Sequence, residues 1–428
     1  MPIYRSGRMA RFQDDFALLN QFSALMRMPG ETGTFLLAKE AVNGPVVQMA
    51  DGELLGFSGF DYLGLGQHPQ VTEAAREAIG RYGTTAAASL VCGGQTDVHA
   101  RLEQRLADFL GVEAALTFNS GFSTNASTIG FLFDDKDLIL HDALMHASAV
   151  EGARTTGAKR IAFAHNDVAA LEALLTEHRG RHPRVLVLIE GAYSMDGDIA
   201  PLREIVELKR RHEFFLMIDE AHSLGTLGAS GRGIAEHWGV PRDAVDIWMG
   251  TLSKSLASVG GYIAGSRELI TYLRFNCPGF LFSTGLPPSA AAAADAALAV
   301  LQAEPQRARQ LQQRVTAAQR IALSMGLDIG TASHAPILPV ILKDRDLTWY
   351  ASFALHGRRI GVHPLSHPAC AWGQARLRFF ITLAHSEAQI EQAMAQVVQV
   401  VLEGLEVGRA MGRQIDSPLA AGAAVQGA

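Results

Sequence analysis

The sequence predicts an α/β protein: a large domain with a mostly parallel sheet between helices, followed by a smaller α+β domain. Two observations lead to this fold class. Short apolar runs alternate with helical patterns between about residue 60 and residue 300, the rhythm of strand-helix-strand units. The chain has 428 residues, and a single core stops growing at roughly 250 to 300 residues. We therefore expect an N-terminal segment over 1–60, a large domain over 61–300 and a C-terminal domain over 301–428.

The candidate strands of the large domain are short and nearly continuous in apolar residues. Strands of this kind are buried on both faces, so helices are expected to cover both faces of the sheet. The candidates are Ala114 to Phe118, Leu138 to Leu140, Arg160 to Phe163, Val185 to Ile189, Phe214 to Ile218, Asp246 to Met249 and Gly261 to Ala264.

Two helices of the large domain have clear ends. The stretch from Asp97 to Leu110 has apolar residues at helical spacing, with Asp97 as the expected N-cap and Gly111 as the stop. Another helix is expected to begin at Pro201, a residue that suits the first helical turn. It should end among Lys209 to Arg211, where cations interact favourably with the helix dipole.

The pattern changes after an alanine-rich segment at 290–299. A helix is expected from about Glu304 to Met325, with strands over Pro336 to Leu342 and Arg376 to Thr382. Ser386 to Gln389 has the form of a capping box that opens the last helix. The tail from about residue 417 is rich in Ala and Gly and is expected to fray.

Composition indicates a small-molecule partner in the cytoplasm. A formal net charge of −6 offers no broad positive field, so nucleic acid is not an expected partner. Cys92, Cys277 and Cys370 are far apart and suggest neither a disulfide framework nor a CxxC metal site. The segment from Met1 to Phe22 lacks the features of an export signal, and no run approaches the ~20 apolar residues of a membrane span. Peripheral membrane contact through the N-terminal segment stays open.

The stretch Met249 to Gly261 holds Lys254 among small hydroxylated residues and glycines, just after an apolar strand. It is not a P-loop, because Ser253 and Trp248 stand where that motif needs glycine. A lysine in a partly dry pocket has a lowered pKa and can attack a carbonyl. The alternative is an ordinary solvated lysine, and the fragment alone favours that alternative.

A buried strand upstream ends in Asp219, and His222 follows three residues later. Ligands of α/β sheets lie at such strand ends. The carboxylate could hold a ring nitrogen protonated, and the histidine could reach a neighbouring ring oxygen. Two alternatives stay open: an N-cap aspartate with a surface histidine, and a metal pair, which lacks further ligands at a suitable spacing.

Two further fragments can contact a cofactor. Phe118 to Asn125 follows a strand and should open a helix, whose free N–H groups suit a phosphate; the alternative is a simple glycine turn. His146 is placed at a helix start, where an imidazole could stack on a flat ring. The alternative for this histidine is a polar helix cap.

These fragments occur together and in one order, and the set resembles one enzyme family. In chain order they are Gly121-Phe122, Met145-His146-Ala-Ser, Tyr193-Ser-Met-Asp-Gly-Asp-Ile-Ala-Pro201, Asp219-Glu-Ala-His222 and Thr251-Leu-Ser-Lys254. The set is similar to the α-oxoamine synthases, a family of pyridoxal-phosphate enzymes that includes serine palmitoyltransferase and 8-amino-7-oxononanoate synthase. The resemblance runs from about Asp61 to Leu402. It implies the fold-type I architecture of aspartate aminotransferase.

The resemblance implies roles around the cofactor ring. Lys254 would form the Schiff base and act as the base, and Asp219 would pair with the pyridinium nitrogen. His222 and Ser194 would approach the phenolic oxygen, and His146 would stack on the ring. These residues are the ones that the family uses for pyridoxal 5'-phosphate.

The resemblance also implies a phosphate site and a homodimer. Thr251 and the N–H groups of Gly121 and Phe122 would hold the phosphate. Ser283 and Thr284, in Phe282-Ser-Thr-Gly, resemble the segment that reaches the phosphate of a neighbouring subunit. The resemblance therefore implies a homodimer with shared active sites.

The reaction that the resemblance implies is a decarboxylative condensation. A small L-amino acid, serine or alanine first and glycine next, would join an acyl thioester on coenzyme A or a carrier protein. The products would be an α-amino ketone, carbon dioxide and free thiol. Arg378 matches the arginine that meets the amino acid carboxylate, and Phe60 is similar to the serine-using branch. Leu90 departs from the family, which commonly has arginine there.

Other functions on the same fold stay open. An aminotransferase or an aldolase would share Lys254 and Asp219, but neither explains the block from Ser194 to Pro201 together with His146 as well. A non-catalytic partner subunit is a third interpretation. Such a partner typically lacks the lysine, so Lys254 argues against it.

Overall fold

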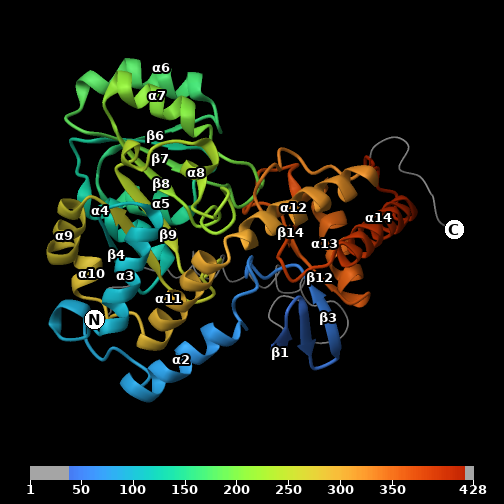
Figure 1. Ribbon diagram of the computed structural model, residues 1–428. Helices are drawn as coiled ribbons and strands as arrows, with labels where there is room; N and C mark the ends of the chain where they lie inside the picture. Colours follow the sequence, from blue (N-terminus) through green and yellow to red (C-terminus); the bar gives the residue numbers. More distant parts are fainter. Residues whose placement is uncertain (1–37, 420–428) are drawn as a thin grey trace, which may run out of the picture.

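The computed structural model describes residues 38–419 of the chain. Two expectations about the N-terminus, that it has no export signal and that membrane contact through it stays open, therefore concern residues outside this range. Most of the predicted frayed tail also lies outside the described residues. Figure 1 shows a large part that holds the main sheet and, beside it, a smaller part built from the carboxyl-terminal helices.

The main sheet has seven strands in the order β4-β10-β9-β8-β7-β5-β6. All neighbours pair in parallel except β10, which is antiparallel to both β4 and β9. The mostly parallel sheet is thus confirmed, and each predicted strand is present within a residue or two. The strands are β4 (Ala114–Phe118), β5 (Leu138–Asp142), β6 (Lys159–Phe163), β7 (Val185–Glu190), β8 (Phe215–Asp219), β9 (Ile247–Thr251) and β10 (Gly261–Gly265).

Both faces of this sheet are buried, as its apolar strands predicted. Along β7, Val185, Val187 and Ile189 belong to one hydrophobic cluster, whereas Leu186 and Leu188 belong to a second. Alternate residues of a strand point to opposite faces, so the two clusters are the two sides of the sheet.

Each cluster is completed by its own helices (Figure 1). The second cluster is covered by α4 (Gly121–Leu132), α5 (Ala147–Thr155), α9 (Arg267–Asn276) and α10 (Pro278–Leu281). The first is covered by α2 (Pro69–Tyr82), α3 (Asp97–Leu110), α6 (Val168–His178), α7 (Leu202–His212), α8 (Ile234–Trp238) and α11 (Pro288–Ala303).

Two predicted helix starts were wrong by one residue. The N-cap of α3 is Thr96, not Asp97, because the backbone N–H of Thr96 donates to His99 Nδ1 at 3.1 Å in a capping box. The Asp97 carboxylate instead accepts a hydrogen bond from the hydroxyl of Tyr82. Pro201 is the N-cap of α7 rather than a residue of its first turn, while the basic end of that helix is as predicted.

The carboxyl-terminal part has the elements that the sequence predicted. A three-stranded antiparallel sheet in the order β11-β14-β13 packs with the long helices. Ser386 and Gln389 form the predicted capping box, with Gln389 N donating to Ser386 Oγ at 3.2 Å. The elements are α12 (Gln306–Ser324), β11 (Ile337–Lys343), α13 (Arg345–Gly357), β12 (Ile360–Gly361), β13 (His363–Leu365), β14 (Ala375–Phe380) and α14 (Glu387–Ala410).

The first described residues join this carboxyl-terminal part, which the sequence did not predict. Strands β1 (Lys39–Asn43), β2 (Val46–Met49) and β3 (Gly52–Gly56) form a sheet whose fourth strand is β12. The chain then continues along β14, where Phe380 N donates to Phe57 O at 2.8 Å and Leu383 N to Tyr62 O at 2.9 Å. This path carries residues 57–62 to the edge of the main sheet.

A membrane crossing has no support in the part of the chain that the structure describes. Over residues 38–419, no helix combines the length and hydropathy that such a crossing needs.

Candidate active site

The predicted site residues meet at one edge of the main sheet. Glu190, Asp219 and Thr251 are the last residues of β7, β8 and β9, three adjacent parallel strands. Lys254 follows three residues after β9. The carboxyl ends of parallel strands are where α/β sheets place their ligands.

Lys254 lies in a loop that is closed at both ends. Thr251 pairs with Gly261 across β9 and β10, and inside the loop Ala257 N donates to Lys254 O at 2.9 Å. Ala257 itself has a φ of +50°, a left-handed conformation that a residue with a Cβ adopts only when its surroundings impose it. The backbone around the lysine is therefore held in one shape.

The surroundings of the Lys254 amine favour its action as a nucleophile. Burial lowers its pKa to about 8, although the negative charges of Asp219 and Glu190 oppose that shift. Its Nζ lies 2.9 Å from His222 Nε2. A lowered pKa leaves a larger share of neutral amine near physiological pH, and only the neutral amine attacks a carbonyl.

His222 is buried between Lys254 and a tyrosine. Its Nδ1 lies 2.7 Å from the hydroxyl of Tyr62, which is itself fully buried. Burial, and then the charge of Lys254, hold the pKa of His222 well below its usual value. The imidazole is therefore neutral at physiological pH.

Asp219 is a buried carboxylate held by two donors. The amide of Asn125 donates to its Oδ2 at 2.7 Å, and Ala221 N donates to its Oδ1 at 2.9 Å. The side chain of Asn125 also donates to Ser148 Oγ at 2.9 Å. Only 4% of Asp219 is exposed. A buried charge of this kind needs a cationic partner, which a protonated ring nitrogen would supply.

His146 caps a helix, which is one of the two roles that the sequence left open, and the second role, stacking on a cofactor, stays a prediction. It is the N-cap of α5, and its Nδ1 lies 2.7 Å from Ser148 Oγ. The residue is nevertheless exposed, and its ring approaches that of Phe122 at 6.5 Å between centroids. Partial burial lowers the pKa of His146. A neutral, partly open imidazole that is fixed at one nitrogen suits stacking on a flat ring.

The start of α4 and the end of β9 form a cradle for an anion. A Cβ built on Gly121 would lie 2.9 Å from Thr251 Oγ1, so only glycine allows this approach. Gly121 and Phe122 are the first two residues of the helix, where backbone N–H groups have no intrahelical partner. Thr251 Oγ1 lies 2.7 Å from Ser253 Oγ, which adds a second hydroxyl.

Arg378 and Ser194 also lie together. Arg378, in β14, donates to the backbone oxygen of Ser194 at 2.9 Å and lies over the ring of Phe380 at 4.8 Å. Its neighbour Arg376 differs, because it forms a buried ion pair with Asp196 at 2.5 Å. Within residues 38–419, Arg378 makes no ion pair, so its charge is free to meet a carboxylate, as the predicted role requires.

Phe60 forms part of the wall beside the lysine. Lys254 Nζ lies 6.0 Å from the centroid of its ring, which meets Phe380 edge-on at 5.8 Å. A cavity of about 690 Å³ extends from Lys254 and Phe60 to the apolar side chains of Val47, Met49 and Leu54. The predicted substrate-side residue thus borders a cavity whose lining is partly apolar.

Ser283 and Thr284 lie at the surface next to the start of α4. The side chain of Asn119 donates to Thr284 O at 3.3 Å, and Ser283 Oγ donates to Gly279 O at 2.6 Å. Their neighbour Phe282 is 87% exposed. In the described residues no hydrogen bond links the two hydroxyls to the other predicted site residues.

Leu90 packs in the hydrophobic core at the position where the family resemblance led us to expect arginine. It is 5% exposed and belongs to the hydrophobic cluster on the α4 side of the sheet. A Cβ on Gly285 would lie 2.3 Å from its Cδ2. This position therefore contributes apolar contacts instead of a positive charge.

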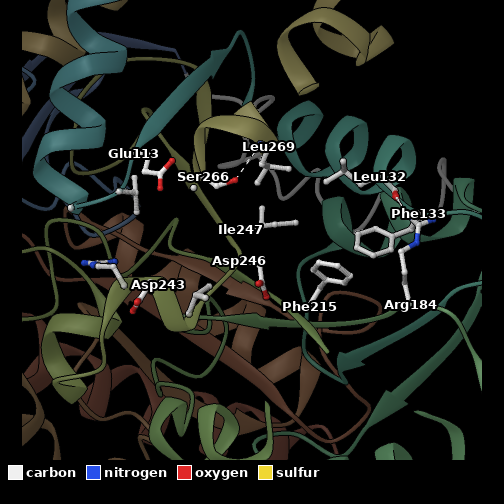
Figure 2. Close-up of a pocket in the computed structure, with 15 residues that line it drawn as sticks. Glu113, Leu132, Phe133, Arg184, Phe215, Asp243, Asp246, Ile247, Ser266 and Leu269 are labelled. Atoms are coloured by element: carbon white, nitrogen blue, oxygen red, sulfur yellow. Dashed lines mark hydrogen bonds between the residues drawn. The ribbon is translucent and has the colours of Figure 1, made fainter. Parts of the chain in front are cut away.

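A larger cavity of about 730 Å³ lies at the opposite edge of the sheet (Figure 2). It is lined by Phe215 and Ile247, the first residues of β8 and β9, and by Phe133 and Arg184. It contains none of the predicted site residues. Because catalytic groups of α/β sheets gather at the carboxyl ends of the strands, the smaller cavity beside Lys254 is the candidate active site.

Three site residues were not predicted from the sequence. Tyr62, Asn125 and Glu190 are buried in or beside the site. Glu190 ends β7 in the same way that Asp219 ends β8, and the two residues are paired across the strands. A carboxylate at a strand end was thus the signal that could have identified Glu190.

Comparison with known proteins decides the family. The model of the aminotransferase class I and II family matches residues 53–397. The chain is 41% identical over 353 residues to 8-amino-7-oxononanoate synthase of Geobacter sulfurreducens, covering 81% of this chain and 88% of that protein. It is 37% identical over 360 residues to serine palmitoyltransferase of Bacteroides thetaiotaomicron, covering 84% and 91%. The chain belongs to the α-oxoamine synthases.

Solved structures agree with this α-oxoamine synthase assignment. Serine palmitoyltransferase of Sphingomonas wittichii superposes with a TM-score of 0.83 at 29% identity, over 95% of this chain and 98% of that one. A serine palmitoyltransferase with pyridoxal phosphate superposes with a TM-score of 0.82 at the same identity and coverage. The fold-type I architecture, the cofactor and the acyltransferase class expected from the sequence are therefore confirmed.

The residues of this α-oxoamine synthase fit pyridoxal phosphate. The Gly121–Thr251 cradle suits its phosphate, the buried Asp219 carboxylate suits its ring nitrogen, and the amine of Lys254 suits its aldehyde. The individual roles of these residues stay predictions.

The lowered pKa of Lys254 predicts how cofactor capture depends on pH. In cofactor-free protein mixed with pyridoxal phosphate, the capture rate should rise about tenfold per pH unit and level off above pH 8, because only the neutral amine attacks the aldehyde. Visible absorption would follow the capture. Borohydride should then fix the cofactor to Lys254 in the wild type and in a surface control, Lys159→Ala, but not in Lys254→Ala. A plateau only above pH 10 would contradict the lowered pKa.

Proposed function

We propose that this α-oxoamine synthase condenses a small L-amino acid with an acyl thioester, with loss of carbon dioxide and free thiol, to give an α-amino ketone. Serine or alanine is the favoured amino acid, with glycine next, and the acyl group is carried by coenzyme A or an acyl-carrier protein. The observation that carries this proposal is a desolvated lysine amine 2.9 Å from a neutral histidine, beside a buried carboxylate. Relatives named for this reaction type share 36% to 41% of their sequence with the chain.

Asp219 and Lys254 would divide the proton chemistry between them. Pyridoxal phosphate, when bound, supplies an aldehyde that takes up the amino acid and a ring that accepts electrons from its α-carbon. The negative charge of Asp219, fixed by Asn125 and Ala221 N, would keep a facing ring nitrogen protonated. Lys254, with its lowered pKa, would take the α-proton and later return one.

His222 and His146 would orient the reacting groups. His222 faces Lys254 through Nε2, so it can donate to an oxygen that lies beside the amine. His146 is fixed as the N-cap of α5 and leaves a ring face open. Both rings are neutral by virtue of their lowered pKa values, so neither adds a positive charge that would compete with the pyridine ring.

The shape of the cavity supports an apolar acyl chain. Val47, Met49, Leu54 and Phe60 are among the residues that line it, together with polar residues such as Lys254. An apolar wall beside a few polar groups is typical of pockets that bind a hydrocarbon chain with a polar head. A chain in this space would present its thioester to the region beside Lys254.

The test of the reaction is a panel of amino acids crossed with acyl-CoA and acyl-carrier thioesters. We expect thiol and carbon dioxide to be released in equal amounts with at least one pair, and the yield to disappear in Lys254→Ala. Keto acid formation without thiol would favour an aminotransferase, retro-aldol products would favour an aldolase, and no turnover with bound cofactor would favour a non-catalytic partner subunit.

Arg378 should control the affinity for the amino acid. Arg378→Met keeps the length of the side chain but removes its charge, so the KM for the amino acid should rise about 10- to 100-fold, the loss of one charge-assisted contact. The KM for the acyl thioester should change little. Arg154→Met, at a surface position with 64% side-chain exposure, is the control. An unchanged KM in Arg378→Met would exclude this role.

We also propose a cytoplasmic homodimer whose interface lies over α4, α9 and α10. Phe122, Tyr272, Phe275 and Phe282 are exposed on these adjacent elements, and a cluster of exposed aromatic residues suits a protein interface. Ser283 and Thr284 would then reach the phosphate of the partner subunit. The three cysteines are free thiols, which suits a reducing compartment.

The interface can be tested by one substitution. Phe282→Glu adds a charge where the dimer would bury an apolar ring, so the dissociation constant should increase about 100-fold. Light scattering after size exclusion would report twice the mass of one chain for the wild type and less for the variant. Leu323→Glu, at an exposed site on α12, is the control. A wild-type protein with the mass of one chain would contradict the dimer.

A further inference from the structure

Three side chains, two buried and one half-buried, form a hydrogen-bonded row in the candidate active site. The hydroxyl of Tyr62 lies 2.7 Å from His222 Nδ1, and His222 Nε2 lies 2.9 Å from Lys254 Nζ. Tyr62 is fully buried and His222 is 6% exposed. We propose that Tyr62 is a positioning residue that fixes His222 as an Nε2–H donor directed at the nitrogen of Lys254 and at the ligand that replaces it.

Counting donors and acceptors leads to this tautomer. Burial raises the pKa of Tyr62, so its hydroxyl keeps its hydrogen. In the described part of the chain, His222 Nδ1 is the only hydrogen-bond partner of that hydroxyl. If Nδ1 carried a hydrogen, the hydroxyl would have to accept, and its own hydrogen would be left buried without an acceptor, which is costly. Donation from Tyr62 to Nδ1 avoids that cost.

The tautomer has a direct consequence for the lysine. A neutral imidazole with an unprotonated Nδ1 carries its hydrogen on Nε2. Nε2–H can only donate, so Lys254 Nζ, 2.9 Å away, must accept with the lone pair of a neutral amine. Tyr62 therefore acts through His222 to favour the reactive form of Lys254. When the amine is engaged elsewhere, the same N–H is available to an oxygen of the cofactor.

The charged groups around Lys254 and His222 are other residues than Tyr62, and they would all remain if the Tyr62 hydroxyl were removed. Lys254 faces Asp219, Glu190 and Arg378, and His222 faces Lys254, Arg378 and His146. A substitution of Tyr62 by phenylalanine thus changes one hydrogen bond and no formal charge.

Tyr62 is well anchored for such a role. Its backbone oxygen accepts from Leu383 N at 2.9 Å, and its ring meets Phe380 edge-on at 6.1 Å. Phe380 lies parallel to the ring of His222, with 6.3 Å between centroids. The phenylalanine ring of a Tyr62→Phe variant would keep these contacts.

The test compares Tyr62→Phe with the wild type in two measurements. Nitrogen NMR of histidine-labelled holoenzyme, with His222→Gln used to assign the signal, should show an unprotonated Nδ1 and a protonated Nε2 in the wild type. In Tyr62→Phe we expect a mixture of tautomers. In cofactor-free full-length protein, the midpoint for acylation of Lys254 should rise by about one pH unit from about 8, because a protonated amine can then donate to a bare Nε2.

Tyr262→Phe is the matched control. Tyr262 is also fully buried, but its hydroxyl has no hydrogen-bond partner among the described residues, so neither measurement should change. The inference rests on the proposed function only in assigning His222 a ligand to face. Because both measurements are made without turnover, a failure of this inference is distinguishable from a failure of the proposed reaction. A wild-type His222 protonated on Nδ1, or a Tyr62→Phe variant identical to the wild type in both measurements, would overturn it.

Discussion

The buried carboxylate of Asp219 is the constraint on which the rest of the site depends. It ends a central strand and is 4% exposed, and among the described residues its hydrogen-bond donors are an amide and a backbone N–H. Such a charge is costly unless a cation pairs with it, and within residues 38–419 no side chain forms an ion pair with Asp219. The site is therefore arranged for a ligand that brings its own positive nitrogen, and the family assignment identifies that ligand as pyridoxal phosphate.

The site also depends on a contact between distant parts of the chain. Residues 57–62 run along β14 and are held there by backbone hydrogen bonds to Phe380 and Leu383. This path places Phe60 and Tyr62 beside Lys254, while β14 itself supplies Arg378. The residues predicted to face the substrate thus come from the small sheet and its N-terminal neighbour, and most of the residues predicted to face the cofactor come from the main sheet.

The main sheet and the polar residues that follow its strands could be predicted from the sequence because their signals are local. Each apolar strand is continuous, and Asp219, His222 and Lys254 follow strands within a few residues. The three N-terminal strands were missed because they are short, separated by glycine turns and only partly apolar. The Tyr62–His222 contact joins residues 160 positions apart, and no local pattern encodes it. Asp97 was wrongly predicted as the N-cap because two adjacent residues, Thr96 and Asp97, can both cap a helix. The hydrogen bond from Thr96 N to His99 Nδ1 makes Thr96 the N-cap.

The single reversed strand of the main sheet has a consequence for catalysis. Because β10 runs against β9, the chain leaves the sheet at Thr251 and re-enters it opposite, at Gly261. A parallel partner would have required a long crossover helix between those positions. Lys254 instead lies in a short loop whose two ends are both fixed in the sheet. The conformational entropy of ordering this loop is lost once, on folding. In its predicted role, Lys254 would leave its bonding partner and bind it again in every turnover, and the fixed loop would return it to the same position.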